Sequence, residues 1–253
     1  MYGRGDTRIE QMGGDASALA HCALVVSAPR RGEDAGVRRK VSGIFLGLML
    51  AVGPVLAGTA HEGYDLIFRT GTLEDFAPGD ALHYQSETEN AAAPPEAQGA
   101  QGYDLRIEEG GTARLMRVLD TGQQPVAGFD ATVGNPMAMF FLERLVRDLA
   151  QATGGSTFYI RNRIKESLLA PVGISPVQVT WQGKDHAGQE VLLAPFVGDA
   201  NAARLGPFAE LQVVFEVSET VPGWYHSMRA ETPERDSGGR YFSSTLALSE
   251  TEE

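Results

Sequence analysis

The sequence predicts an α+β fold in which an antiparallel sheet of about eight strands carries an inserted helical hairpin. Three observations lead to this prediction. Short segments of alternating apolar and polar residues fill both ends of residues 61–253, two segments with a helical period lie between them, and Gly or Pro turns separate the segments. Strands that alternate with helices throughout would indicate a doubly wound parallel sheet instead. About eight strands would also allow the sheet to curl into a half-barrel around the hairpin.

The first predicted strands form an antiparallel meander. They are residues 64–71, 81–89, 103–109 and 113–120. Pro78-Gly79 predicts a turn between the first two strands, and Gly110-Gly111 predicts a tight hairpin between the last two. Residues 91–102 (AAAPPEAQGAQG) have the composition of a flexible loop.

A helix is predicted after this meander, from Asn135 to Gly154. Asn135 can cap its start, Pro136 suits the first helical position, and Gly154 suits a left-handed exit. Its apolar residues recur with a helical period and form one face. They are Ala138, Phe141, Leu142, Leu145, Val146 and Leu149.

A second helix is predicted over residues 156–170, with Ser156 as its cap and Pro171 as its end. Ile160, Ile164 and Leu168 recur every four residues and define its buried face. The connection between the two helices is short, so they should form a helical hairpin.

Strand patterns return in the last third of the chain. The segments are residues 177–183, 190–196, 211–219, 224–231 and 241–249. Turn residues at 183–188, 221–223 and 237–239 separate them. Residues 61–253 are therefore expected to form a single domain.

Residues 37–60 have the layout of a secretory signal peptide. A basic cluster at 38–40 precedes the apolar segment 44–56, and small residues follow it. The apolar segment has about 13 residues, whereas a membrane-spanning helix needs about 20. We therefore expect cleavage after Ala57 or Ala60, no membrane span in the mature protein, and a periplasmic location.

Residues 1–36 show no sustained helical or strand period. We expect them to be a non-native or disordered leader, with translation starting at a GTG codon for Val37. The pair Arg38-Arg39 leaves twin-arginine export open as an alternative route. No Cys follows the predicted cleavage region, so we expect no lipid anchor.

Composition excludes several classes of function. The formal net charge is −12, and residues 61–253 are more acidic still, which opposes binding to nucleic acid. The single cysteine, Cys22, precedes the signal peptide, so the mature chain has no disulfide and no thiolate ligand. Residues 61–253 contain no GxSxG, HExxH, P-loop, GxGxxG or EF-hand motif. We therefore expect no cofactor and no metal site, and favour a non-enzymatic protein.

Six residues are candidates for binding a ligand. They are Met137, Phe140, Arg161, Lys165, Trp224 and His226. Arg161 and Lys165 share a helix face and would hold an anionic group, unless neighbouring acidic residues neutralise them. Met137 and Phe140 either pack under the sheet or line an apolar cavity. Trp224 and His226 either form the mouth of a pocket or pack within a strand.

Four segments together are similar to uncharacterised exported proteins of Gram-negative bacteria. They are EGYDLIFRTGTLEDF, VGNPMAMFFLERLVRDLA, FYIRNRIKESL and VPGWYHS. This resemblance implies export but no activity. The expected architecture also resembles, more distantly, periplasmic lipoprotein carriers that place a curled sheet over helices, and architecture alone transfers no function.

Two functional hypotheses follow. The first is a periplasmic binding or envelope-associated protein for an apolar or lipid-like anionic ligand, with an apolar cavity of several hundred Å³. The alternative is a periplasmic hydrolase in which His83 or His226 acts as a base. It requires a carboxylate such as Asp65, Asp104 or Glu231 at about 3 Å from the imidazole, inside a cleft. The sequence leaves the ligand and the oligomeric state open.

Overall fold

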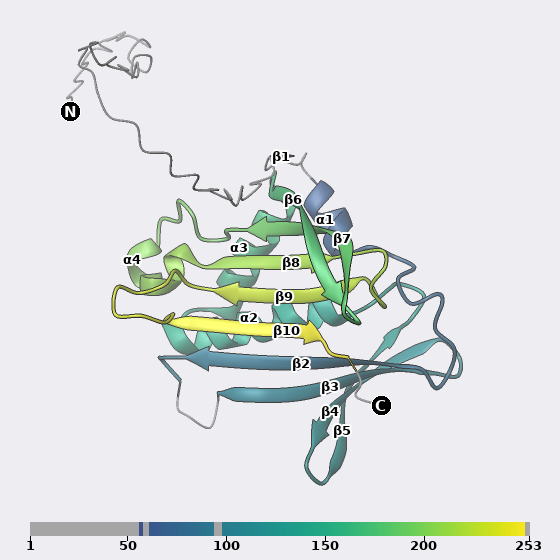
Figure 1. The fold of residues 1–253 in the computed structure, drawn as a ribbon. Coiled ribbons are helices and arrows are strands. Elements are labelled where there is room, and N and C mark those ends of the chain that lie inside the picture. The colour runs from purple at the N-terminus through teal and green to yellow at the C-terminus, as the bar shows by residue number, and fades with distance from the viewer. Residues whose placement is uncertain (1–55, 58–60, 94–97, 251–253) are drawn as a thin grey trace, which may run out of the picture. The chain divides into compact units, whose positions relative to one another are not determined.

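A computed structural model describes residues 56–57, 61–93 and 98–250 of the chain. The predicted leader, residues 1–36, lies outside these ranges, as does the predicted signal peptide apart from residues 56–57. The described chain forms an open antiparallel sheet with two helices packed against one face (Figure 1). The predicted α+β class is confirmed.

The sheet has ten strands in the order β1-β6-β7-β8-β9-β10-β2-β3-β4-β5. Their bounds are β1 (Leu56–Ala57), β2 (Ala81–Asn90), β3 (Gly99–Glu108), β4 (Thr112–Leu119), β5 (Gly122–Asp130), β6 (Gly173–Trp181), β7 (Lys184–Leu193), β8 (Gln212–Val217), β9 (Tyr225–Glu231) and β10 (Phe242–Leu248). Every neighbouring pair is antiparallel. The last strand, β10, pairs with β2, so the first and last thirds of the described sequence meet in the middle of the sheet (Figure 1).

Strand β5 was not predicted. It contains Pro125 and two glycines, and its first five residues are all exposed, so it shows no alternation of buried and exposed side chains. Its pairing with β4 shifts in register between Leu115 and Met116, where Met116 lies opposite Pro125. Among the described strands, β5 pairs on one side only and forms an edge of the sheet.

The prediction of a strand at residues 64–71 is wrong, because Glu62–Ile67 forms helix α1. Tyr64 and Phe68, four residues apart, pack against each other with ring centroids 4.8 Å apart and ring planes tilted by 46°. The last carbonyl groups of the helix accept hydrogen bonds from two side chains, one just before β9 and one at its first residue. The Trp224 indole N–H donates to the Leu66 carbonyl oxygen at 2.8 Å, and the next residue, a tyrosine, donates to the carbonyl of Ile67. These distant partners stabilise a helix that its own sequence does not indicate.

The predicted helical hairpin is confirmed as α2 (Met137–Thr153) and α3 (Thr157–Leu169). All of the apolar residues predicted for the two buried faces are buried. Gly154 ends α2 in the left-handed conformation, with φ of 64°. Two short helices that were not predicted, α4 (Ala202–Leu205) and the 3₁₀ helix η2 (Gly206–Glu210), join β7 to β8.

One buried amide connects the start of α2 to the sheet. Helix α2 begins at Met137, with Pro136 and not Asn135 at the N-cap position, and Asn135 Oδ1 accepts a hydrogen bond from the Met137 N–H at 3.1 Å. Its Nδ2 donates to the Tyr84 hydroxyl at 2.8 Å and to the Gly223 carbonyl oxygen at 2.7 Å. The helix, strand β2 and the turn before β9 are thereby held together by a single side chain.

The space between the helices and the sheet is filled with large side chains. Phe141 of α2 packs edge-on against Phe215 of β8, with ring centroids 6.2 Å apart. Tyr84, Phe215 and Phe242 are each 0 or 1% exposed. The apolar faces of the helices and of the sheet therefore form the core of this part of the chain.

The β6–β7 hairpin folds back over the other face of the sheet. The Thr180 carbonyl oxygen near the end of β6 lies 3.2 Å from Nε2 of His226, although β6 and β9 are separated by two strands. At the hairpin tip, the Gln182 N–H donates to the carboxylate of Glu250 near the C-terminus. The sheet is strongly bent at this end, but it does not close into a barrel, because β1 and β5 do not pair.

Candidate functional site

Two adjoining cavities lie where the loop after α1 meets the turn before β9. The first, here the Trp224 cavity, has a volume of about 690 Å³. The second, here the His83 cavity, has a volume of about 760 Å³. Asp75, Phe76 and Pro222 line both cavities and separate them.

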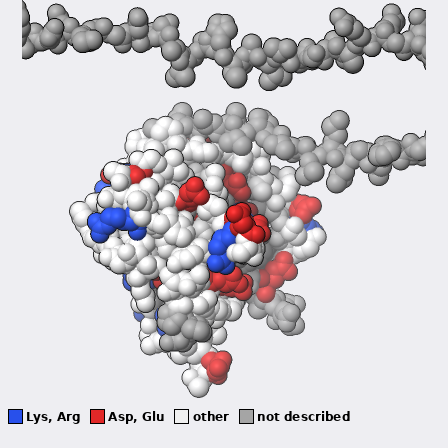
Figure 2. Space-filling view, turned by 90° about the vertical axis from the view of Figure 1, so that its left-hand side faces the viewer, with Lys and Arg blue, Asp and Glu red and all other residues white. Residues whose placement is uncertain are grey.

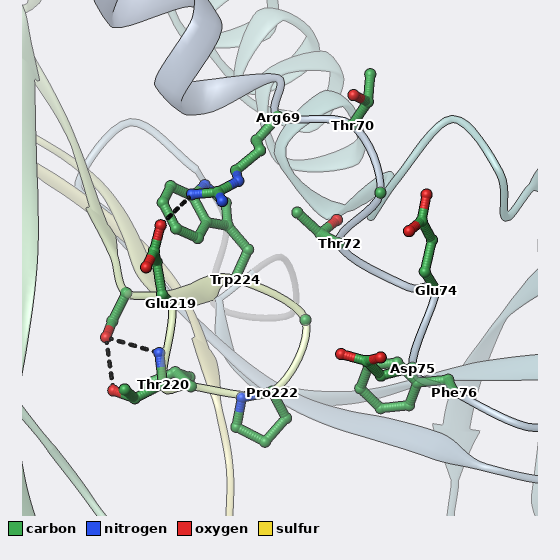
Figure 3. Close-up of a pocket in the computed structure, with 14 residues that line it drawn as sticks. Arg69, Thr70, Thr72, Glu74, Asp75, Phe76, Glu219, Thr220, Pro222 and Trp224 are labelled. Carbon is green, nitrogen blue, oxygen red and sulfur yellow. Dashed lines mark hydrogen bonds and ion pairs between the residues drawn. The ribbon is translucent and has the colours of Figure 1, made fainter.

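The Trp224 cavity is built around a stacked cation (Figure 3). The Arg69 guanidinium carbon lies 4.4 Å from the centre of the Trp224 ring, within the range of a cation–π interaction. Arg69 Nη1 also donates to Glu219 Oε1 at 2.9 Å. Trp224 itself is 6% exposed, because its indole is anchored to α1. Arg69 is therefore held at the cavity wall on an aromatic support.

The backbone that presents Trp224 is in an unusual conformation. Trp224 has φ of 80° and follows Gly223 with φ of 70°. A bulky side chain with positive φ is rare, and such conformations cost of order 1–3 kcal/mol. The turn is held by a hydrogen bond from the Ser218 N–H to the Trp224 carbonyl oxygen, at 3.0 Å. Such strained positions cluster at binding sites and active sites.

Carboxylates outnumber cations in the Trp224 cavity. Glu74 and Asp75 line the wall across from Arg69, and Glu219 is already paired with that arginine (Figure 3). The hydroxyl of Thr72 is also on the wall and accepts a hydrogen bond from the Asn135 N–H at 2.8 Å, so it remains able to donate. The site can satisfy donors on a ligand, whereas an added anion would meet two carboxylates that have no ion pair with any described residue.

An apolar groove adjoins this cavity on the other side of Arg69. Its volume is about 180 Å³, and its wall includes Phe68, Phe129, Val133 and Met139. Val133 is 64% exposed and Met139 is 52% exposed. Arg69 lines both the groove and the Trp224 cavity, so a polar hollow and an apolar hollow meet at this residue.

The six sequence-predicted ligand residues do not form one site. Trp224 lines the cavity named after it, but neither that cavity nor the apolar groove is lined by the other five. Met137 is fully buried in the core, and Phe140 packs edge-on against Tyr103 with ring centroids 5.0 Å apart. Packing, the first of the two interpretations given for Met137, is what the structure shows.

The cations of the helical hairpin are largely neutralised within the chain. Arg161 donates two hydrogen bonds to Glu143, each 2.8 Å long, and Arg163 pairs with Asp199 at 2.8 Å. Lys165 is exposed. On the face shown in Figure 2, basic side chains are scattered among acidic and uncharged ones. The sequence left open that nearby acids neutralise Arg161. Its ion pair with Glu143 does so, and no ligand is needed to balance its charge.

His226 forms a cluster with a carboxylate that the sequence analysis did not consider. Its Nδ1 lies 3.1 Å from Glu216 Oε2, and its Nε2 lies 3.2 Å from the Thr180 carbonyl oxygen. Both partners are acceptors, so an imidazolium, with a hydrogen on each nitrogen, satisfies both contacts. We call this arrangement the His226 clasp, since it joins the β6–β7 hairpin to β8 and β9.

Glu216 is the centre of the clasp. Hydrogen bonds from His226 and Ser227, together with the charge of Arg229, lower its pKa to about 2, although burial acts in the opposite direction. Ser227 Oγ donates at 2.8 Å and Arg229 Nη1 at 3.1 Å. With these contacts His226 serves to connect strands, and it lines neither of the two cavities described above.

His83 makes the second close contact between an imidazole and a carboxylate. Its Nδ1 lies 2.7 Å from Asp104 Oδ1, and His83 lines the cavity named after it. Of the carboxylates that the hydrolase hypothesis named, Asp104 is thus within reach of a histidine. Glu231 instead pairs with Arg240 at 3.2 Å, and Asp65 lies exposed on α1.

The residues missed by the sequence analysis are Arg69 and the apolar groove around Met139. Arg69 lay in a segment predicted to be a strand, and no local pattern places it beside Trp224.

Within the described ranges, no helix is long and apolar enough to cross a membrane, and no three His, Cys, Asp or Glu side chains are grouped so as to hold a metal ion.

Comparisons with known proteins add little to this geometry. No protein-family model matches the sequence, and no curated protein matches it significantly. Among solved structures, the lipoprotein LppX of Mycobacterium tuberculosis matches 70% of this chain and 87% of its own, with 12% sequence identity and a TM-score of 0.30. A match at this TM-score supports no inference about function.

Proposed function

We propose that the chain is an exported binding protein for a small amphiphile. The polar part of the ligand occupies the Trp224 cavity and its apolar part occupies the groove of Phe68, Phe129, Val133 and Met139. The observation that carries the proposal is that Arg69 lines both hollows, so one ligand can reach both.

The sizes of the two hollows restrict the ligand. The groove, at about 180 Å³, is smaller than the roughly 300–1,000 Å³ of typical small-molecule sites, whereas the Trp224 cavity falls within that range. Each buried methylene contributes about 0.8 kcal/mol, so a short alkyl chain or a ring buried in the groove contributes a useful share of the binding free energy. A short-chain amphiphile fits better than a lipid buried along its whole length.

The charges of the cavity favour a neutral, hydroxyl-rich head group. Glu74 and Asp75 accept hydrogen bonds from hydroxyls, and the arginine donates to an oxygen of the ligand while it remains stacked on Trp224. An anionic head would approach these two carboxylates at short range. This part of the proposal differs from the anionic ligand expected from Arg161 and Lys165.

Export is supported by the sequence layout of residues 37–60, which combines a basic cluster, a short apolar segment and small residues. A periplasmic location fits a role in binding small molecules outside the cytoplasm. N-terminal sequencing of the protein from a periplasmic extract of a Gram-negative host tests it. An intact residue 37–60 segment in that fraction would contradict the assignment.

Ligand binding is tested by titrating the protein with octyl glucoside below its micelle concentration and, in parallel, with decanoate. Fluorescence reports on the site because Trp224 lines it, and a Trp181→Phe background removes the signal of the other tryptophan. We expect octyl glucoside to bind more tightly than decanoate. We also expect Arg69→Ala and Met139→Ser each to weaken binding by about 5- to 10-fold, which corresponds to about 1 kcal/mol.

Arg161→Ala is the matched control, since that arginine lies outside both hollows. Equal loss of binding in Arg161→Ala and Arg69→Ala would refute the site. Tighter binding of decanoate would refute the neutral head group. If neither octyl glucoside nor decanoate binds, the amphiphile proposal is refuted.

A further inference from the structure

We infer that His83, positioned by Asp104, is a general base for the hydrolysis of neutral carboxylic esters in the His83 cavity. The His83 cavity is separate from the proposed amphiphile site. The contact between His83 and Asp104 and the residues around the two side chains support this role.

The pair is held by strand register and by a buried carboxylate. His83 of β2 lies directly opposite Asp104 of β3, and Nδ1 is 2.7 Å from Oδ1. The Asp104 side chain is 8% exposed, whereas that of His83 is 37% exposed. The second carboxylate oxygen accepts a hydrogen bond from Gln123 Nε2 at 2.5 Å and lies 3.6 Å from Arg106 Nη2. Asp104 therefore has a fixed orientation, while the imidazole reaches solvent.

This contact determines where the imidazole can accept a proton. An ionised carboxylate only accepts hydrogen bonds, so the hydrogen of the neutral ring lies on Nδ1, and Nε2 carries the lone pair. Among the described residues, Nε2 of His83 has no hydrogen-bond partner. The same relation between an acid, an imidazole and a reacting group serves general-base catalysis in many hydrolases.

The walls of the His83 cavity favour a neutral substrate with an apolar part. Leu82, Trp181 and Leu248 provide apolar surface, and Asp80 and Glu250 provide negative charge. Phosphate esters and carboxylate-bearing substrates would be repelled by these acids at short range. A neutral ester meets no such barrier, and its alkyl or acyl group can cover the apolar wall.

Water is the nucleophile that the residues allow. Ser249 also lines the cavity, but its hydroxyl donates to the backbone carbonyl of His83 at 3.1 Å and is not activated by the imidazole. The single cysteine of the sequence, Cys22, lies outside the described residues. A covalent acyl intermediate on Ser249 is therefore not expected.

The reaction balances with these groups alone. Nε2 of His83 removes a proton from water as the water oxygen bonds to the ester carbonyl carbon, while the carbonyl π bond opens and its electron pair moves to the carbonyl oxygen. The imidazolium then returns that proton to the leaving oxygen as the π bond re-forms and the carbon–oxygen bond to the alcohol breaks. The products are a carboxylic acid and an alcohol, one water is consumed, and His83 is again neutral. Asp104 is a positioning residue that also stabilises the transient imidazolium.

The test is hydrolysis of p-nitrophenyl butyrate by the wild type and by His83→Gln, Asp104→Asn and His186→Gln. His186, on β7, is the matched control because its imidazole lies outside the cavity. General-base catalysis contributes roughly 10²- to 10⁴-fold, so we expect His83→Gln to lower kcat/KM by about 100-fold and His186→Gln to leave it unchanged. No burst of p-nitrophenol should precede the steady state.

A positioning role for Asp104 has its own signature. Asp104→Asn should lower kcat with little change in KM. A loss that appears as a higher KM with kcat unchanged would indicate a merely structural role and would overturn this part of the inference.

Three outcomes would overturn the inference as a whole. They are a wild-type rate no higher than that of His83→Gln, an equal loss in His186→Gln, and a burst that shows an acyl intermediate. Far-UV circular dichroism checks that the variants fold. If Asp104→Asn does not fold, ¹⁵N NMR of the wild-type protein still shows which ring nitrogen of neutral His83 carries the hydrogen. A hydrogen on Nε2 would contradict the proposed geometry. His83→Gln should leave octyl glucoside binding unchanged, so failure here is distinguishable from failure of the proposed function.

Discussion

Replacing Glu216 with Gln removes the negative charge at the centre of the His226 clasp and keeps the shape of the side chain. In the folded protein the pKa of Glu216 is lowered from its ordinary value of 4.5 to about 2, above all by the hydrogen bond from His226. A lowered carboxyl pKa means that the ionised form is favoured by folding. Its contribution to stability is therefore complete above pH 4.5 and is lost as the pH falls through 2.

The size of the effect follows from these two pKa values. The separation between these two pKa values corresponds to about 3 kcal/mol at pH 5.5 and to roughly half as much at pH 3. The Glu216 side chain is 14% exposed, so screening by solvent reduces these figures only in part. We expect Glu216→Gln to lower the free energy of unfolding by about 3 kcal/mol at pH 5.5 and by about half as much at pH 3.

Urea denaturation of the wild type and the variant at both pH values measures this difference. The matched control is Glu219→Gln, which removes an exposed carboxylate that also pairs with an arginine. That change should cost at most about 1 kcal/mol, as for other surface ion pairs. A Glu216→Gln deficit that is equal at the two pH values, or larger at pH 3, would refute the assignment of Glu216 as an ionised and hydrogen-bonded centre.

Three further predictions concern the fold. Asn135→Ala leaves the Gly223 carbonyl and the Tyr84 hydroxyl without their donor, so it should lower the free energy of unfolding by about 2–4 kcal/mol. Urea denaturation measures this loss, and a loss under about 1 kcal/mol would contradict the central role of this amide. Gly223→Ala places a Cβ 2.4 Å from Leu82 Cδ1, at a residue whose φ of 70° already disfavours alanine. Thermal unfolding of this variant should show a clearly lower Tm, and an unchanged Tm would contradict the described turn. Arg161→Ala breaks an exposed ion pair and should change the free energy of unfolding by less than about 1 kcal/mol, whereas a larger loss would indicate that this pair supports the helical hairpin.

The elements that could be predicted are those with a regular pattern of burial. The helix containing Phe141 and Leu145 shows a full apolar face, and β10 alternates buried and half-buried side chains along its whole length. In both cases the period in the sequence is the direct result of one face packing against the core. Such segments need no knowledge of distant partners.

The elements that could not be predicted depend on distant partners or on exposure. Helix α1 is short, and its last carbonyl groups are satisfied by Trp224 and Tyr225, which lie 158 residues away in sequence. Strand β5 shows no period because its first half is exposed on both faces. Local sequence contains neither kind of information.

The candidate sites were only partly predictable for the same reason. His83 and Asp104 were both named, but their contact depends on the register between β2 and β3 across a long loop. The partner of His226 is Glu216, which is brought within reach by the pairing of β8 with β9. Arg69 could not be identified, since its position over Trp224 follows from the unpredicted helix before it.

Strand β5 has a consequence for how the protein behaves at high concentration. An edge strand with unpaired backbone groups can join the edge of a second molecule and begin a growing fibre. Pro125 provides no N–H, and the shift in register beside it interrupts the regular spacing of the neighbouring ladder. Both features disfavour a regular intermolecular ladder along β5.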